Sequence, residues 1–185
     1  MDRAQRQRRS PRLRGYDYRT AGAYFVTVCT ANMQHRFGTI RNGIMHLNDE
    51  GQIARQCWLA IPDHFPHVEL DAFIIMPNHM HGIVVIVEDA KDSSVRTRHA
   101  SSVPQTPSMR PKGTPAGSLG AIIGSYKSAV TREINRSNGT PGARVWHGRY
   151  HDHIIRSEAD LERIRAYILY NPSMWPADRY YRAGG

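Results

Sequence analysis

Long hydrophobic runs, clustered cysteines and acidic residues are all scarce in this chain of 185 residues. No apolar run approaches the roughly 18 residues of a membrane-spanning helix, so we expect no membrane association. The basic N-terminus is not followed by an apolar segment, so we expect no secretory signal. The cysteines, Cys29 and Cys57, have neither zinc-binding nor redox spacing, and we expect both to be reduced in a cytoplasmic protein. A phosphate-binding glycine loop is also missing, which argues against a nucleotide cofactor.

Basic residues are abundant: 25 Lys and Arg against 16 Asp and Glu give a formal net charge of +9. Seven of the arginines lie within residues 1–19. Such a balance is typical of a protein with a polyanionic partner, most often nucleic acid. The alternative is a soluble protein with a charged tail, because clustered arginines seek phosphates without reading a sequence.

Hydrophobic periodicity predicts an α+β fold from the order strand, helix, strand, strand, helix, strand, helix. This order fits a ferredoxin-like (RRM-like) antiparallel four-stranded sheet with two helices on one face, plus a C-terminal helix. We expect a single domain over 1–185, with a basic tail at 1–15 and a flexible insertion at about 88–117, rich in Ser, Thr, Pro and charge. The expected elements are strands at 24–30, 67–76, 79–87 and 150–156, helices at 48–61, 118–135 and 157–171, and a hairpin at 36–47.

Two histidines interrupt the most hydrophobic of these strands. Alternate side chains of a strand share a face, so His79 and His81 are expected to point the same way, about 6–7 Å apart, with Met80 opposite. Two imidazoles on one face can converge on one metal ion. The alternative is two unrelated histidines, one bound to the backbone and one facing solvent.

The last helix carries a second pair of polar residues. Its predicted apolar stripe is Leu161, Ile164 and Ile168, with Leu169 at the flank. Tyr167 and Asn171 are four residues apart at the edge of this stripe, so they stand on one face of the helix. Together they can supply a phenol nucleophile and an amide oxygen for a metal. An equally simple interpretation is that Tyr167 lies at the boundary of the core and that Asn171 ends the helix before Pro172.

The motifs together resemble the REP-associated tyrosine transposases, relatives of the HUH single-tyrosine transposases. The resemblance covers about residues 12–175, and Met80 occupies the hydrophobic position of the HUH motif. Its segments in this chain are GYDY, AYFVTVCT, FGTI, MPNHMHG, SLGAIIGSYKSAVT, VWHGRYHDHIIR and LERIRAYILYNP.

The resemblance implies a metal-dependent endonuclease and strand transferase that acts on single-stranded DNA. Tyr167 would be the nucleophile, joined to a 5′ phosphate as a covalent intermediate, with Tyr170 only as a substitute candidate. His79, His81 and Asn171 would hold a divalent ion, and the oxygen- and nitrogen-rich ligand set favours Mg or Mn.

Single-stranded or hairpin DNA is the expected partner, in particular hairpin-forming repeats. Whether the protein acts as a monomer or a homodimer, and whether Tyr167 serves its own chain or a partner, stays open. The alternatives are a non-catalytic, domesticated DNA-binding regulator of repeat hairpins and an RRM-like RNA-binding protein. The candidate DNA contacts are Arg6, Arg8, Arg9, Arg12, Arg14, Lys127, Arg132 and Arg149.

Overall fold

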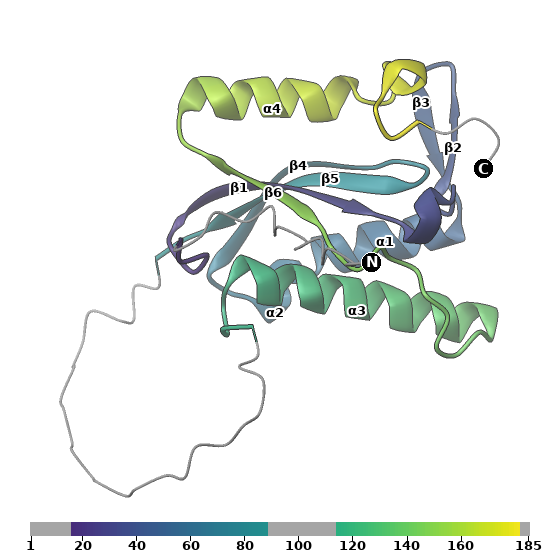
Figure 1. Cartoon of the computed structure of the whole chain (residues 1–185), viewed down its shortest axis with the longest axis horizontal. Helices are drawn as coiled ribbons and strands as arrows, with labels where there is room; N and C mark the ends of the chain where they lie inside the picture. The colour runs from purple at the N-terminus through teal and green to yellow at the C-terminus, as the bar shows by residue number, and fades with distance from the viewer. Residues whose placement is uncertain (1–15, 89–113, 182–185) are drawn as a thin grey trace, which may run out of the picture.

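The computed structural model describes residues 16–88 and 114–181 of the chain. In these residues a four-stranded sheet lies between two helical layers, and a small hairpin stands beside it (Figure 1). The expected basic tail at 1–15 and most of the expected insertion at 88–117 fall outside the described residues.

The sheet has the ferredoxin-like order β4-β5-β1-β6, with every neighbouring pair antiparallel. The predicted fold class is therefore confirmed. β1 and β5 form the centre of the sheet, so the histidine-bearing strand is flanked by β4 and β1. The strands are β1 (Gly22–Cys29), β4 (Val68–Ile75), β5 (His79–Ile86) and β6 (His151–Ile155).

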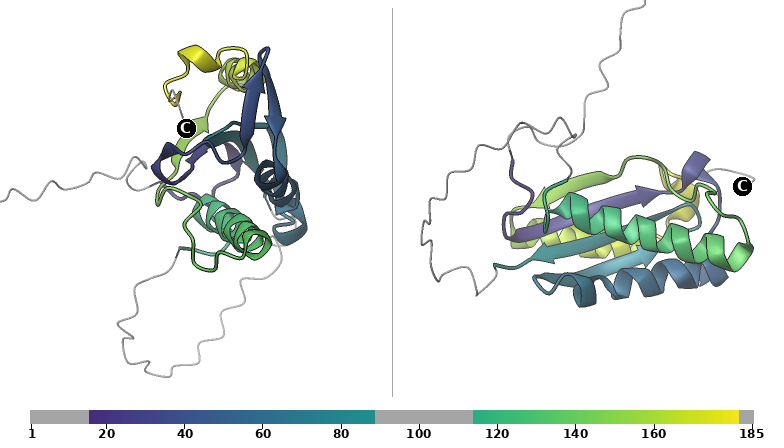
Figure 2. Two further views of the ribbon diagram at one scale, coloured as in Figure 1. Left: turned by 90° about the vertical axis from the view of Figure 1, so that its right-hand side faces the viewer. Right: turned by 90° about the horizontal axis from the view of Figure 1, so that it is seen from below.

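One face of the sheet packs on α1 (Asp49–Leu59), the short α2 (Ile61–His64) and α3 (Leu119–Asn138). Figure 2 shows α1 and α3 side by side below the sheet. The main hydrophobic core fills this interface, with Trp58, Tyr24 and Tyr126 among its largest fully buried side chains. Side-chain oxygens of Asn48 and Ser118 accept from backbone amides at the starts of α1 and α3, as expected of helix caps.

The opposite face is covered by α4 (Glu158–Tyr170), which lies above the sheet in Figure 1. Ile164 and Ile168 are buried against Ile83 of β5 and form a second, smaller core. An RRM-like protein binds RNA on an open sheet face. Because α4 occupies that face here, the structure argues against the RNA-binding alternative.

Polar contacts hold α4 in its position over the sheet. The guanidinium of Arg165 donates to both carboxylate oxygens of Asp71, at 3.0 and 2.5 Å. Asp71 lies in a register shift of β4, between Leu70 and Phe73. Such a bulge redirects a side chain, and here it accompanies an acidic group facing the helix.

The expected hairpin is present as β2 (Gly38–Arg41) and β3 (Ile44–Leu47). Asn42 and Gly43 have φ angles of 52° and 71°, the positive values that a two-residue hairpin turn requires. The hairpin stands next to α4 and the C-terminal residues in Figure 2. Consistent with this, a Cβ added to Gly43 would lie 3.3 Å from Ser173.

Two details of the helix faces differ from the sequence pattern. Leu169, at the flank of the predicted apolar stripe, is 70% exposed, and Leu59 at the end of α1 is 44% exposed. The inner face of α1 consists instead of Gly51, Ala54 and Trp58. Hydrophobicity alone therefore does not assign these leucines to a buried face, because much of the surface of a folded protein is apolar.

Both cysteines are free thiols, as expected. Within residues 16–88 and 114–181, no helix has the length and apolar character to cross a membrane.

Candidate active site

The two histidines of β5 lie on the α4 side of the sheet, and both side chains are fully buried. Met80 between them points into the main core on the other side, so the expected shared face is confirmed. The ring centroids are 4.6 Å apart, and the two Nε2 atoms are 3.1 Å apart. Both histidines therefore direct the same ring nitrogen toward one point.

Hydrogen bonds on the other ring nitrogens orient these imidazoles. Asn78 donates through Nδ2 to the carbonyl oxygens of Met33 and Tyr180, which fixes its Oδ1 toward His79 Nδ1 at 2.8 Å. His79 Nδ1 must therefore carry the proton, and its Nε2 offers a lone pair. His81 Nδ1 lies 2.9 Å from Thr27 Oγ1, a hydroxyl that can accept from it or donate to it. Partners of this kind typically hold metal-binding histidines in the correct orientation.

Both imidazoles are neutral at physiological pH. Burial lowers the pKa of His79 to about 4, partly opposed by the negative charge of Asp178. Burial, together with the neighbouring His79, also lowers the pKa of His81 well below its ordinary value. Neutral imidazole is the form that binds a cation.

The last turns of α4 bring the predicted tyrosine and asparagine to the same point. The Tyr167 hydroxyl lies 3.2 Å from His81 Nε2, and its ring packs edge-on against Phe25 at 6.1 Å. Tyr167 is 40% exposed, so its hydroxyl meets the histidines while part of the ring faces solvent. Asn171 is 2% exposed, and its buried Oδ1 has no hydrogen-bond partner. An unpartnered buried oxygen is costly unless something binds it.

The surroundings keep the phenol protonated. Burial, with the nearby Asp178 charge, raises the pKa of Tyr167 to about 12. A phenol with this pKa is almost entirely un-ionised at neutral pH. A nearby positive charge would favour the phenolate.

Residues after α4 complete the site, and none of the sequence motifs pointed to them. We call residues 174–181 the C-terminal turn. It begins with a 3₁₀ turn, Trp175–Ala177, and folds back over the histidines. The His79 ring lies 5.9 Å from the ring of Trp175 and 4.6 Å from the ring of Tyr180. Ligand atoms of Asp178, His79 and His81 all lie within 4.8 Å of one another.

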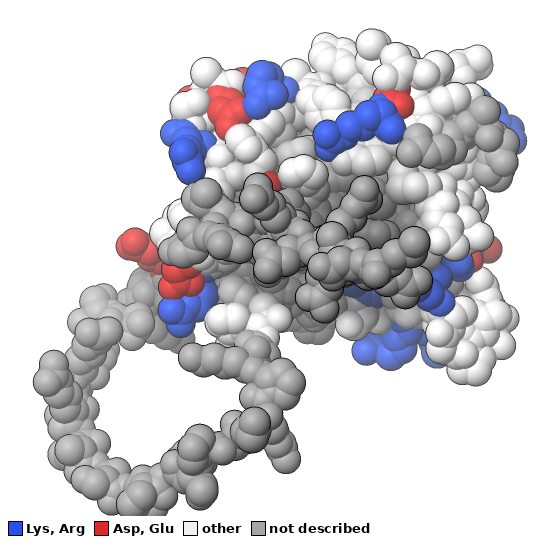
Figure 3. All heavy atoms as spheres, viewed as in Figure 1, with Lys and Arg blue, Asp and Glu red and all other residues white. Residues whose placement is uncertain are grey.

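Tyr167 lines two hollows. One, of about 380 Å³, is bordered by His151 and His153 of β6. The other, of about 500 Å³, is bordered by Tyr170 and Met174 and is the more apolar. Tyr167, Arg163 and Arg179 line both hollows. Figure 3 shows basic side chains near both ends of this upper layer.

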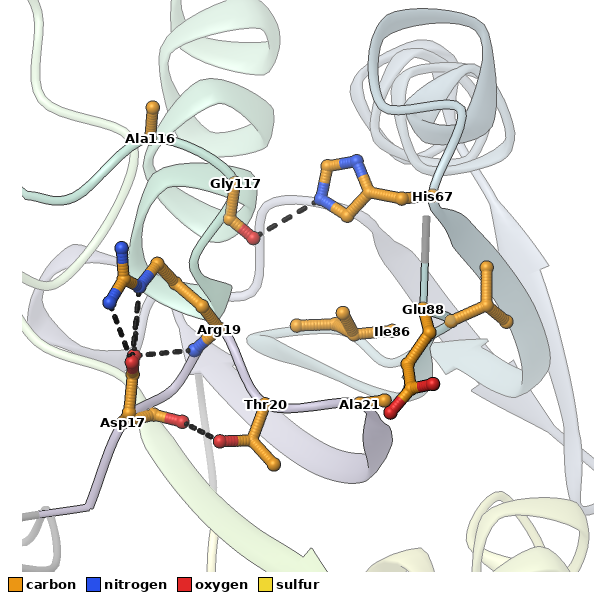
Figure 4. A pocket seen from close by; sticks show the side chains of 10 residues that line it. Asp17, Arg19, Thr20, Ala21, His67, Ile86, Glu88, Ala116 and Gly117 are labelled. Atoms are coloured by element: carbon orange, nitrogen blue, oxygen red, sulfur yellow. Dashed lines mark hydrogen bonds and ion pairs between the residues drawn. The ribbon is translucent and has the colours of Figure 1, made fainter. Parts of the chain in front are cut away.

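A larger hollow than these two, about 770 Å³, lies elsewhere. It is found where β1 begins and β5 ends, at the opposite end of β5 from His79. Figure 4 shows Arg19 paired with Asp17 on one wall, and His67 bonded to the Gly117 carbonyl on another. Glu88, Ala116 and Gly117 also line it.

The three candidate DNA contacts that the structure describes are not gathered at this site. Lys127 and Arg132 belong to α3, on the face of the sheet opposite α4, and Lys127 donates to the His147 carbonyl at 2.8 Å. Arg132 meets Glu133 at 3.3 Å, and Arg149 is exposed in the loop before β6. Arg6, Arg8, Arg9, Arg12 and Arg14 lie outside the described residues. The basic residues beside the phenol, Arg163 and Arg179, were not among those predicted.

Comparison with known proteins supplies relatives of nearly full length. A Haemophilus influenzae protein described as "Uncharacterized protein" is 41% identical over 177 residues, covering 94% of this chain and 93% of its own. A second H. influenzae protein, described as "Putative REP-associated tyrosine transposase", is 23% identical over 175 residues, covering 90% and 84%. No protein-family model matches the chain.

Among solved structures, a REP-associated tyrosine transposase bound to a REP hairpin matches with a TM-score of 0.55 and 20% identity. The match covers 88% of this chain and 72% of the other. At this identity the match shows a shared fold, and it agrees with the sequence motifs. The resemblance to the REP-associated tyrosine transposases is therefore confirmed. At 41% identity over nearly the full length of both chains, this protein and the first Haemophilus protein belong to the same family.

Proposed function

We propose that this protein is a metal-dependent, single-stranded DNA endonuclease and strand transferase with Tyr167 as its nucleophile. The observation that carries the proposal is the 3.2 Å approach of the Tyr167 hydroxyl to His81, whose Nε2 is in turn 3.1 Å from that of His79. The phenol thus lies beside two converging, neutral imidazoles. This is the arrangement expected of a nucleophile adjoining a metal site.

The side chains fit a divalent cation. His79 and His81 are neutral, are oriented through Nδ1, and direct Nε2 toward each other. The buried Asn171 Oδ1 lacks a partner within the described residues, as a metal-ligating amide oxygen would without its ion. Bound there, Mg or Mn would polarise the scissile phosphate and stabilise negative charge on the reacting oxygens. Imidazole and oxygen ligands together suit Mn at least as well as Mg.

The protein's own part in the reaction is to position the phenol. In the proposed step the Tyr167 oxygen forms a bond to phosphorus while the bond from phosphorus to the 3′ oxygen breaks. The phenol proton is lost to solvent, and the departing 3′ oxygen takes one up as a hydroxyl. The tyrosine ester keeps the bond energy, so a second 3′ hydroxyl can reverse the step on another strand without ATP.

Three observations support DNA as the substrate: the net charge, the hollows beside Tyr167 and the similarity to a transposase. The net charge of +9 favours a polyanion, and the distantly similar transposase was solved with a REP hairpin. The two hollows that Tyr167 lines leave room for nucleotides next to the reacting phosphate. Arg163 and Arg179 border both hollows and are well situated to contact backbone phosphates.

A single chain supports a complete site, because Tyr167 approaches the histidines of its own chain. We therefore propose that the tyrosine acts in cis. Mixing Tyr167→Phe protein with a His79→Ala, His81→Ala double variant tests this point. Restored cleavage in the mixture would show that the tyrosine of one subunit serves the histidines of another.

The central experiment is recovery of a covalent protein–DNA adduct. Wild-type protein incubated with hairpin-containing single-stranded DNA and Mn²⁺ should give an SDS-resistant complex carrying 5′-phosphotyrosine. Tyr167→Phe should bind DNA yet form none. The matched control is Tyr170→Phe, one turn further along the chain at a residue 61% exposed, which should form the adduct normally. An adduct from Tyr167→Phe refutes the assignment of the nucleophile.

The same assay separates this proposal from the non-catalytic alternative. A regulator that only binds repeat hairpins would shift DNA mobility without producing an adduct in wild-type protein under any divalent ion. The His79→Ala, His81→Ala variant should lose cleavage, and undiminished cutting by it would exclude the metal role of the histidines.

A further inference from the structure

The C-terminal turn, residues 174–181, is built into the histidine cluster. The Asn78 amide donates to the Tyr180 carbonyl at 2.8 Å, so the residue that orients His79 also anchors this turn. Trp175 is 7% exposed, and its ring packs near both His35 and His79. The turn is therefore a wall of the site, not a loosely attached end.

Asp178 is the acidic side chain that this wall presents to the histidines. Its carboxylate accepts from Asn171 Nδ2 at 2.9 Å through one oxygen, and from the Tyr180 backbone amide at 2.6 Å through the other. Each carboxylate oxygen can accept more than one bond. Both contacts therefore leave lone pairs available, and together they fix the direction of the group.

We propose that the Asp178 carboxylate is a protein ligand of the divalent cation, alongside His79 and His81. The geometry that supports this is the approach of all three ligand atoms to within 4.8 Å of one another. The inference rests on the proposed function, because it concerns the same cation. It adds a charged ligand from the C-terminal turn, which lies outside both the histidine motif and α4.

A carboxylate changes the properties of the site. Two imidazoles and an amide are all neutral, so without Asp178 the full positive charge of the ion would remain in a largely buried pocket. One carboxylate cancels part of this charge, and two histidines with one carboxylate form a common site for first-row divalent metals. Mn²⁺ should therefore bind more tightly than Mg²⁺.

Asn171 is compatible with this arrangement and contributes to it. Its Nδ2 holds Asp178, while its Oδ1, which has no partner, remains available to the ion. A reversed amide would direct oxygen against carboxylate oxygen, so Asp178 also determines which way Asn171 points. The two side chains act as a pair in which each orients the other.

The test is Mn²⁺ binding by the full chain, measured by titration calorimetry and by paramagnetic quenching of tryptophan fluorescence. Trp175 reports on the site because its ring lies 5.9 Å from that of His79. Trp58 and Trp146 belong to the main core and supply a background common to all variants. Neither readout depends on cleavage.

Asp178→Asn is the main variant, because its remaining oxygen can still accept from Asn171 while the charge and the acceptor for the Tyr180 amide are lost. We expect Mn²⁺ affinity to fall by about 10-fold or more. Removing a residue that only orients a metal ligand already costs about 10-fold, and removing a ligand should cost at least as much. The matched control, Asp63→Asn in α2 on the other side of the sheet, should bind Mn²⁺ like wild type. Asp178→Glu keeps the charge but displaces the oxygens, and should also weaken binding.

The outcomes distinguish an error about Asp178 from an error about the metal site itself. If Asp178→Asn and Asp178→Glu both fold and bind Mn²⁺ as wild type does, while His79→Ala with His81→Ala abolishes binding, Asp178 is no ligand and the proposed function stands. If wild-type protein binds no divalent ion by either readout, the metal site itself is refuted. Should Asp178→Asn not fold, unchanged Mn²⁺ affinity in Asp178→Glu overturns the inference alone.

Discussion

Gly82 lies in β5 immediately after His81, and replacing it with alanine should destabilise the protein by overfilling the main core. A Cβ at this position would lie 2.4 Å from Cζ2 of Trp58, 2.9 Å from Cη2 and 3.1 Å from Cε2. Ordinary carbon contacts begin near 3.5 Å, so the indole or the strand must move by about 1 Å. The motif therefore has glycine after the second histidine for a packing reason.

The indole has little room to move. Trp58 is fully buried, packs edge-on against Tyr126 at 5.2 Å and lies 6.1 Å from Phe73. Overpacking of such a core typically costs about 1–3 kcal/mol. For a chain of this length each kcal/mol lowers the melting temperature by roughly 2–4 °C. Since Gly82 adjoins His81, we also expect a fall in DNA cleavage at temperatures where the variant is still folded.

Urea denaturation followed by circular dichroism would measure the cost, with a double-mutant cycle to identify its cause. Trp58→Phe removes the outer ring that overlaps the new methyl group, so Gly82→Ala should cost much less in that background. A coupling energy of about 1 kcal/mol or more is expected for two side chains in direct conflict. The reasoning is refuted if Gly82→Ala lies within about 0.5 kcal/mol of wild type, or if the two changes are additive.

Further predictions concern how the helices are attached. Asp71→Asn removes the ion pair with Arg165, which lowers the pKa of Asp71, and should reduce the free energy of unfolding by about 0.5–1 kcal/mol at neutral pH. Since that pKa is depressed in the folded state, the contribution is present above about pH 4 and is lost at lower pH. Urea titrations of the two proteins should converge there, and a constant difference down to pH 2 would contradict the pairing. Asn48→Ala removes the oxygen that accepts from the Gly51 amide at 2.9 Å, and should cost about 1 kcal/mol in thermal melts. Asn48→Asp keeps that oxygen and loses only the exposed hydrogen bond that Asn48 Nδ2 donates to the Arg36 carbonyl, so it should cost less than Asn48→Ala. Equal losses would show that the cap is not the cause.

The positions of the helices and strands could be predicted because their signals are local. The strand predicted at 79–87 is observed at His79–Ile86, and the helix predicted at 118–135 begins one residue later, at Leu119, and continues to Asn138. Alternation of side chains along a strand gave His79 and His81 a common face, and helical spacing gave Tyr167 and Asn171 a common face. These rules need only the geometry of one element.

Contacts between distant parts of the chain could not be predicted in this way. The place of Asn78 after Pro77, between two strands, is typical of a turn residue. In the structure Asn78 orients His79 and binds the carbonyl of Tyr180, a residue 102 positions away. Asp178 reads as a polar residue near the end of the chain. Nothing in its local pattern distinguishes it from the other acidic residues, because its significance depends on where the C-terminal turn folds back.

By itself, then, the sequence determined the fold class, the two pairs of candidate site residues and the face of its own element on which each pair stands. Only the tertiary structure decided that α4 covers the histidines. That docking depends on Ile164 and Ile168 meeting Ile83, and on Arg165 reaching Asp71 across 94 residues. It also decided that Asp178 joins the cluster. The physical reason is that periodicity fixes the direction of a side chain relative to its own backbone, whereas a site depends on how separate elements pack together.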